Sequence, residues 1–113
     1  MYSVLVVDDE IRQREAVIKS LEWEKAGFNV VGDAENGIEA LELLETLEPD
    51  LILTDIKMPL MTGLELASRV REIRPATKLV ILSGYDDFEY AKEAFKYNVI
   101  RYLLKPISAS ELS

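Results

Sequence analysis

Short, nearly continuous apolar runs alternate along this chain with longer segments in which apolar residues recur every three or four positions. The apolar runs, which we expect to be strands, are Ser3–Val7, Phe28–Ala34, Leu51–Thr54, Leu79–Leu82 and Val99–Leu104. Such runs are typical of strands buried on both faces, as in a parallel sheet covered by helices. Right-handed crossovers then give a doubly wound α/β sandwich, and five strands favour the order 2-1-3-4-5.

The intervening segments carry helix start and stop signals. Expected helices run from Ile11 to about Ala26, from an Asn36 cap to about Leu47, from a Thr62 cap to Pro75, and from Asp86 or Asp87 through Tyr97. The stretch Glu22–Lys25 is left open as a separate short turn. Thr62 with Glu65 has the spacing of a capping box. The stripe expected to be buried on that helix is Leu66, Ala67, Val70 and Ile73.

A fifth helix is indicated but not completed. Ser108 with Glu111 has the spacing of a capping box, yet the sequence ends at Ser113. One turn cannot cover the face of the fifth strand. We therefore expect residues 1–113 to form a single domain with a truncated fifth helix. The sequence would be either a shortened form of the protein or the front of a longer one. A second copy of the chain covering the bare face, which would make a homodimer, stays open as an alternative.

Composition excludes several classes of function. The chain has 113 residues, 21 acidic and 13 basic, for a net charge of −8, so it lacks the basic footprint of a nucleic-acid-binding protein. It contains no histidine, so a metal site must be built from oxygen ligands. Absence of cysteine fits a reducing compartment. With no apolar leader and no run near the roughly 18 residues of a membrane span, we expect a cytoplasmic location.

Residues whose side chains can bind a ligand or take part in a reaction follow four of the expected strands. Asp8 and Asp9 come after the first strand, Asp55 after the third, Ser83 after the fourth and Lys105 after the fifth. In sheets of this order, ligands bind where the strand order reverses, at the carboxyl ends of strands 1 and 3. A strand-end aspartate on its own is often a helix cap. Three of them at one switch point, with a hydroxyl and an ammonium, indicate a binding site.

Electrostatics indicates what such a site binds. Two unit charges about 4 Å apart repel by about 4 kcal/mol at an effective dielectric near 20, so three carboxylates need a cation or a proton. Lys105 supplies one positive charge. Mg2+ is suited to supply the remaining positive charge, because it binds carboxylate oxygens and keeps coordination positions for water and phosphate. Asp55 could then act as a nucleophile toward phosphorus, with Ser83 and Lys105 contacting phosphoryl oxygens.

Four motifs taken together resemble the receiver domains of two-component response regulators. They are Asp8-Asp9, Asp55-Ile-Lys-Met-Pro59 with Thr62-Gly63, Ser83-Gly84, and Lys105-Pro106. The resemblance spans the chain except most of the fifth helix, and it implies a flavodoxin-like fold and a regulatory domain rather than an enzyme. The stretches Gly84–Lys92 and Tyr102–Ile107 are similar to regulators that carry a C-terminal AraC-type DNA-binding domain.

The resemblance also implies a role for each matching position. Asp55 matches the phosphorylated aspartate, and the metal ligands (Mg2+, or Mn2+ in its place) match Asp8, Asp9, Asp55 and the backbone carbonyl of Lys57. Lys105 matches the lysine that pairs with the phosphoryl group. Ser83 and Tyr102 match the switch hydroxyl and aromatic, which reshape the face formed by the fourth helix and fifth strand. Implied partners are a sensor histidine kinase and an output domain, transcriptional in role, outside this sequence.

Two rival classes share parts of this pattern. A metal-dependent phosphatase with an aspartyl-phosphate intermediate usually has a second acid two residues after the nucleophile, where this chain has Lys57. A flavin-binding module needs a phosphate-cradling loop after the first strand, where Asp8, Asp9 and Glu10 would repel the phosphate. The sequence therefore favours a phosphoacceptor switch over both.

Overall fold

In the computed structural model, five parallel strands form one sheet in the order β2-β1-β3-β4-β5. The strands are β1 (Tyr2–Val7), β2 (Phe28–Ala34), β3 (Leu51–Asp55), β4 (Lys78–Ser83) and β5 (Val99–Leu104). The structure describes residues 1–20, 23–83 and 99–104, and only the backbone at Ser20, Ser83 and 99–104. The predicted flavodoxin-like strand order is confirmed.

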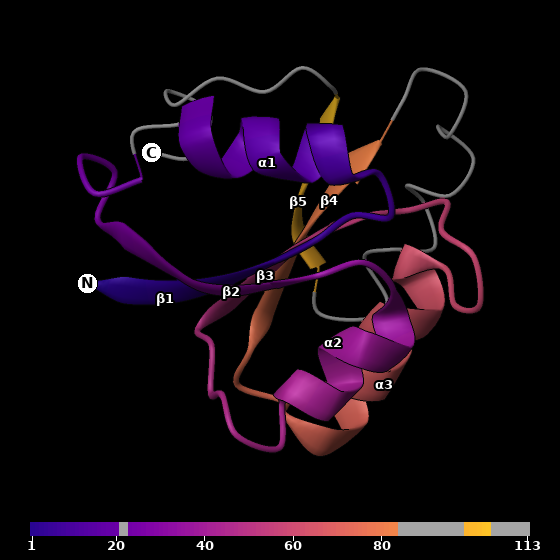
Figure 1. Ribbon diagram of the computed structural model, residues 1–113. Helices are drawn as coiled ribbons and strands as arrows, with labels where there is room; N and C mark the ends of the chain where they lie inside the picture. The colour runs from indigo at the N-terminus through magenta and orange to yellow at the C-terminus, as the bar shows by residue number, and fades with distance from the viewer. Residues whose placement is uncertain (21–22, 84–98, 105–113) are drawn as a thin grey trace.

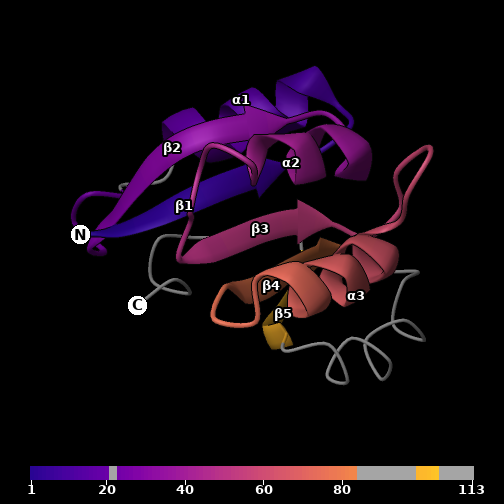
Figure 2. The same ribbon diagram turned by 90° about the horizontal axis from the view of Figure 1, so that it is seen from below.

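Helices lie on both faces of the sheet. They are α1 (Ile11–Ser20), α2 (Gly37–Leu43) and α3 (Gly63–Ile73). α1 covers one face, while α2 and α3 lie side by side on the other (Figures 1 and 2). The predicted helices at residues 86–97 and after Ser108 fall outside the described residues. Within the described part of the chain, no helix has the length and apolar character needed to cross a membrane.

The first two helices end earlier than predicted. α1 ends at Ser20, and residues 23–27 form a turn. This agrees with the alternative left open for Glu22–Lys25 at residues 23–25, the part of that stretch that the structure describes. Gly27 closes this turn with a φ of +87°, a conformation that glycine adopts without steric cost. α2 ends at Leu43 because Glu45 and Thr46 donate backbone hydrogen bonds three residues back, to Glu42 and Leu43, which tightens the last turn.

Two apolar cores lie on the two faces of the sheet. The core under α2 and α3 includes Leu5, Val7, Ile52, Ile81 and Leu66. The core on the α1 face includes Val4, Val6, Leu53, Leu82 and Trp23. Neighbouring core residues of β1, β3 and β4 alternate between the two cores, so the middle of each of these strands is apolar on both faces. This is why the strands could be read from the sequence as unbroken apolar runs.

The edge strand β2 contains a bulge that changes which face its residues point to. Val4 pairs with Val30 but Leu5 pairs with Gly32, so Val31 is an extra residue. Val30 packs against the core on the α1 face, whereas Ala34 belongs to the core under α2. A one-residue insertion reverses the facing of all that follows it. Asp33 consequently lies on the same face as α1.

The expected stripe of α3 is correct except at its end. Leu66, Ala67 and Val70 are buried, but Ile73 is 49% exposed, so its predicted burial is wrong. The next position of the stripe after Val70 is Arg74, whose guanidinium donates from Nη2 to the carbonyl of Leu44 at 2.9 Å and so occupies the space facing α2. Leu64, which the pattern did not single out, is buried in the first turn.

The predicted capping box at Thr62 is present and gives a stability prediction. The Thr62 hydroxyl accepts from the Glu65 N–H at 3.1 Å, and the Glu65 carboxylate accepts from the Thr62 N–H at 3.4 Å. Loss of such a cap costs about 1 kcal/mol. We expect Thr62→Ala to lower the free energy of unfolding by about that amount in urea denaturation. Thr62→Ser keeps the acceptor and should stay close to wild type; equal losses in the two variants would contradict a capping role.

Candidate metal and phosphoacceptor site

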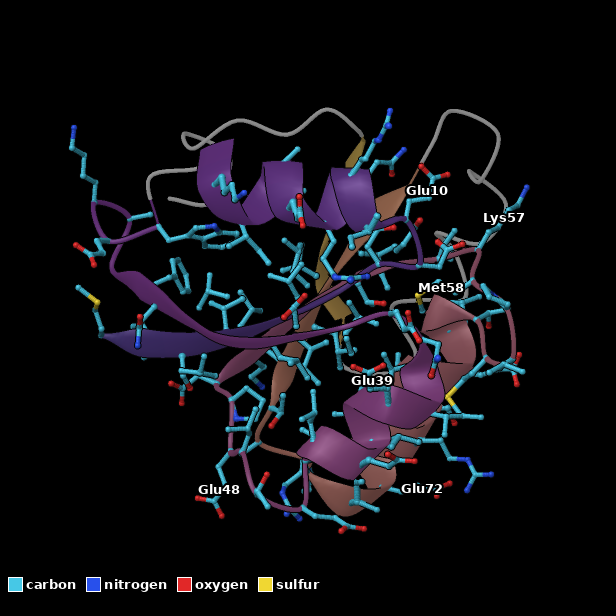
Figure 3. All side chains as sticks on the ribbon, in the orientation of Figure 1. Glu10, Glu39, Glu48, Lys57, Met58 and Glu72 are labelled. Atoms are coloured by element: carbon cyan, nitrogen blue, oxygen red, sulfur yellow. The ribbon has the colours of Figure 1, made fainter. Side chains whose placement is uncertain are left out.

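Three aspartates meet at the carboxyl ends of β1 and β3. These strands are neighbours, with Val7 paired to Thr54, so Asp8 and Asp55 follow at the same level. Each of Asp8, Asp9 and Asp55 offers a carboxylate oxygen, and these oxygens all lie within 4.8 Å of one another. Figure 3 shows Glu10 and Lys57, from the loops after β1 and β3, at this same edge of the sheet.

The three carboxylates differ in their access to solvent. Asp8 is only 2% exposed, Asp55 is half-buried and Asp9 is exposed. This gradient places Asp8 at the base of the cluster, with Asp55 and Asp9 reachable from outside. A partner molecule can therefore reach Asp55 more readily than Asp8.

Hydrogen bonds hold Asp8 at its N–H, at its carbonyl and at one carboxylate oxygen. Its N–H donates to the carbonyl of Ala34 at 3.0 Å, which extends the pairing of β1 with β2. Its Oδ1 accepts from the Glu10 N–H at 3.0 Å, and its carbonyl accepts from the Arg14 guanidinium at 2.7 Å. The start of the β1–α1 loop is thus fixed from three directions.

Asp55 is held from its own strand and the loop that follows. Its Oδ1 accepts from the Ile56 N–H at 2.7 Å, which fixes the plane of the carboxylate. Its carbonyl accepts from the Thr54 hydroxyl at 2.9 Å. Gly63 packs directly against that carbonyl, and its N–H donates to the Ile56 carbonyl at 2.7 Å.

The loop between Ile56 and Thr62 is tightly folded. Met58 is buried beneath it, 4.0 Å from the Thr54 hydroxyl, whereas Lys57 is exposed (Figure 3). Leu60 has a φ of +71°, and the Met61 N–H donates across it to the Pro59 carbonyl at 2.8 Å. This is a γ-turn of the strained kind, in a conformation that costs a non-glycine residue about 1–2 kcal/mol. The loop is therefore held in shape by the contacts at Met58 and Gly63.

The aspartate cluster has the donor set of a hard divalent cation. Oxygens on opposite sides of an octahedral Mg2+ are about 4.2 Å apart, because each lies about 2.1 Å from the ion. A separation of up to 4.8 Å needs only a small rotation to match, and the exposed Asp9 has room for it. Without a cation, three carboxylates at this spacing repel one another. The residues present therefore fit a bound metal ion.

The remaining predicted residues lie at strand ends for which the structure gives the backbone alone. Ser83 is the last residue of β4, one position after Leu82, which pairs with Asp55. Tyr102 lies in β5 opposite Ile81, and Leu104 pairs with Ser83. Lys105 follows directly but falls outside the described residues, as does the face of the fourth helix.

Sequence reasoning assigned no role to two residues that shape this site: Arg14, and Gly63, which it quoted only as part of a motif. Gly63 had a usable signal, because a glycine right after a helix cap and close to a functional aspartate often marks a close backbone approach. For Arg14 the sequence carried no signal beyond its place one turn into a helix that starts beside Asp8 and Asp9. Its contacts depend on where β2 places Asp33, which the sequence pattern does not reveal.

With this fold and site, the chain belongs to the response regulator receiver domain family, whose model matches residues 4–113. This confirms the resemblance noted in the sequence. The family is regulatory rather than catalytic, in agreement with the prediction, and it is neither of the two rival classes.

Two relatives of this chain are named as transcriptional regulatory proteins. The chain is 43% identical over 112 residues to the uncharacterized transcriptional regulatory protein YesN of Bacillus subtilis, covering 99% of this chain and 30% of that protein. It is 38% identical to the transcriptional regulatory protein HptR of Staphylococcus aureus, covering 99% and 44% respectively. The chain thus spans less than half the length of these relatives.

Solved structures give the same result. The receiver domain of AraT, a response regulator from Geobacillus stearothermophilus, is 40% identical with a TM-score of 0.89, covering 98% of this chain and 86% of that one. A two-component transcriptional regulator AraC from Clostridium phytofermentans is 37% identical with a TM-score of 0.87, covering 99% and 87%. The predicted similarity to regulators of the AraC type is confirmed.

Proposed function

We propose that this domain is a phosphorylation-dependent switch in which Asp55 accepts a phosphoryl group from a sensor histidine kinase. The observation that carries the proposal is the convergence of the Asp8, Asp9 and Asp55 carboxylates within 4.8 Å at the carboxyl edge of the sheet. Membership of the receiver family supports it.

Asp55 is the best placed of the three aspartates to act as the nucleophile. Asp8 is almost fully buried, and its Oδ1 accepts from the Glu10 N–H. Asp55 is half-buried, and the Ile56 N–H fixes its orientation. In the transfer, an Asp55 carboxylate oxygen forms a bond to phosphorus as the bond to the donor atom breaks, and the donor leaves with that electron pair.

Asp8, Asp9, Asp55 and the Lys57 carbonyl would hold Mg2+, with Mn2+ as a substitute. When bound, the ion neutralises the carboxylates and the charge of the arriving phosphoryl oxygens. The chain itself supplies the geometry: β1 and β3 fix two of the acids at one level, and the closed loop after Ile56 sets the direction of the Lys57 carbonyl.

We assign the switch to Ser83, Tyr102 and Lys105. Ser83 would move toward the phosphoryl group, Lys105 would pair with it, and Tyr102 would turn into the vacated space. The face formed by the fourth helix and β5 would change as a result. The positions of Ser83 and Tyr102 on the adjacent strands β4 and β5 support this assignment.

The proposal of an output domain as partner rests on the greater length of the relatives. Because the chain covers 30% and 44% of two transcriptional regulators, we propose that residues 1–113 are a receiver domain within a longer protein. A DNA-binding output domain would follow it, while this acidic domain itself would not touch DNA. A cytoplasmic location and a homodimer in which a second copy covers the bare face of β5 complete the proposal.

Acetyl phosphate with Mg2+ provides the test, because it replaces the kinase. We expect intact-mass measurement to show one added phosphoryl group on the wild-type protein and none when EDTA removes the metal. Asp9→Asn removes a proposed metal ligand, so half-maximal incorporation should need Mg2+ raised by about tenfold or more, in line with the loss of a charged ligand. Incorporation that ignores EDTA, or that needs the same Mg2+ in Asp9→Asn, would contradict the proposal.

A further inference from the structure

Arg14 joins α1 to the ends of both β1 and β2. From α1, its Nε donates to Oδ2 of Asp33 at 2.7 Å, and its Nη1 donates to the backbone carbonyl of Asp8 at 2.7 Å. The Arg14 side chain is only 12% exposed, whereas that of Asp33 is 47% exposed. The guanidinium is thus mostly buried and bonded on two sides, with the carboxylate at the surface.

The bulge in β2 is what makes this contact available. Val31 is the extra residue of the β1–β2 pairing, and it shifts Asp33 to the face that α1 covers. Without the bulge, Asp33 would point to the α2 side, away from Arg14. A bulge that redirects a side chain is a recurrent feature beside functional sites.

The contact with the Asp8 carbonyl bears on the placement of Asp9. The Asp8 N–H is already held by Ala34, so fixing the Asp8 carbonyl as well sets the plane of the peptide between Asp8 and Asp9. That plane determines the direction in which the chain leaves Asp8, and therefore where the exposed Asp9 carboxylate can reach. Glu10, whose N–H donates to Oδ1 of Asp8, then precedes α1 directly.

We infer that Arg14, aimed by Asp33, is a positioning residue that orients the Asp8–Asp9 peptide so that both aspartates can share one divalent cation. The inference rests on the proposed function, because it assigns Arg14 a role at the same site. Arg14 touches neither metal nor phosphate in this role; it acts through the backbone of Asp8.

Charge and geometry predict opposite effects of removing Arg14. A guanidinium beside a cation site repels the cation, so its loss alone should tighten Mg2+ binding. Loss of positioning should instead weaken binding, because Asp9 would no longer be held near Asp8. The direction of the change in Mg2+ affinity therefore separates the two effects.

The first measurement is calorimetric titration of the protein with Mg2+, without any phosphodonor. We expect Arg14→Gln to bind Mg2+ about tenfold more weakly than wild type, with far-UV circular dichroism showing that the variant is folded at the titration temperature. Equal or tighter binding by the folded variant would overturn the inference.

Asp33 provides a matched pair of variants in case Arg14→Gln does not fold. Asp33→Asn and Asp33→Ala change the net charge equally, but only asparagine keeps an oxygen that can accept from Arg14 Nε. We expect Asp33→Asn to stay within about twofold of the wild-type Mg2+ affinity and Asp33→Ala to lose about fivefold. Equal affinities for the two variants would show that the contact does not position the site.

Failure of this inference can be told apart from failure of the proposed function. If wild type binds Mg2+, Asp9→Asn loses it, and the Arg14 and Asp33→Ala variants match wild type, the phosphoacceptor proposal stands and the role of Arg14 is wrong. If wild type does not bind Mg2+, the proposed function is wrong and the inference falls with it.

Discussion

Replacing Gly63 with alanine is expected to lower the free energy of unfolding by about 3 kcal/mol, at the upper end for overpacked sites, and to slow phosphorylation. A Cβ at this position would collide with the carbonyl of Asp55 and lie 3.0 Å from the Cα of Ile56. Both are backbone atoms, so no side-chain rotation relieves the clash. The chain must shift where Asp55 is anchored and where Gly63 donates to the Ile56 carbonyl.

Gly32→Ala is the control for this substitution. Its added Cβ would meet the Leu47 Cδ1 at 3.0 Å and the Leu5 Cδ1 at 3.5 Å, which are ends of side chains that can move. We expect it to cost less than about 1 kcal/mol and to leave phosphorylation unchanged. Urea denaturation and the rate of phosphoryl incorporation measure both effects. Equal behaviour of the two alanine variants would contradict a structural role for the contact between Gly63 and Asp55.

Asp55→Asn should abolish phosphoryl incorporation altogether, because an amide oxygen is not a nucleophile toward phosphorus under these conditions. The asparagine can still accept from the Ile56 N–H, so the fold should persist. Removing one of three mutually repelling carboxylates should raise the unfolding free energy of the metal-free protein by about 1 kcal/mol at this partly exposed site. The variant is therefore expected to be inactive and more stable at once.

Asp50→Asn serves as the control for Asp55→Asn. Asp50 precedes β3 at the opposite end of the strand, where its Oδ2 accepts from the Ser3 N–H at 2.8 Å, a contact that asparagine can keep. We expect this variant to incorporate phosphate like wild type and to gain no stability. Intact mass and urea denaturation give the two readouts. A stable Asp55→Asn variant that still gains a phosphoryl group would contradict the assignment.

The sheet and the acidic cluster could be predicted because they depend on local pattern and strand order. Unbroken apolar runs such as Leu51–Thr54 mark buried parallel strands, and the residue after each run must lie at the carboxyl edge. Once β1 and β3 are neighbours, Asp8, Asp9 and Asp55 come together without any detail of side-chain packing. This explains why Asp55 could be grouped with the distant pair Asp8 and Asp9 from the sequence.

Features that depend on register or on packing between elements were not predictable. The bulge at Val31 lies in a strand where two adjacent valines, Val30 and Val31, read equally well as part of an unbroken apolar run, so the pattern does not show that Asp33 turns toward α1. Burial of Ile73 at the end of α3 was predicted wrongly, because the charged side chain of Arg74 occupies the space facing α2 that was expected for Ile73. Such contacts are set by the facing element rather than by the helix itself.

The functional roles of Ser83, Tyr102 and Lys105 remain predictions, and unlike the aspartate cluster they do not follow from strand order. They come from similarity to receiver domains, and strand register supports them only by placing Ser83 and Tyr102 on the strands β4 and β5. In the proposed role their side chains would act only when a phosphoryl group is present, so a sequence pattern cannot establish them.

Locating the phosphoryl group tests the central claim most directly. The protein is phosphorylated with acetyl phosphate and Mg2+, reduced with borohydride so that an acyl phosphate becomes homoserine, and digested for tandem mass spectrometry. The account predicts homoserine at position 55 and at no other aspartate. Homoserine at position 8 or 9, or a phosphate that survives borohydride on a serine or threonine, would contradict it.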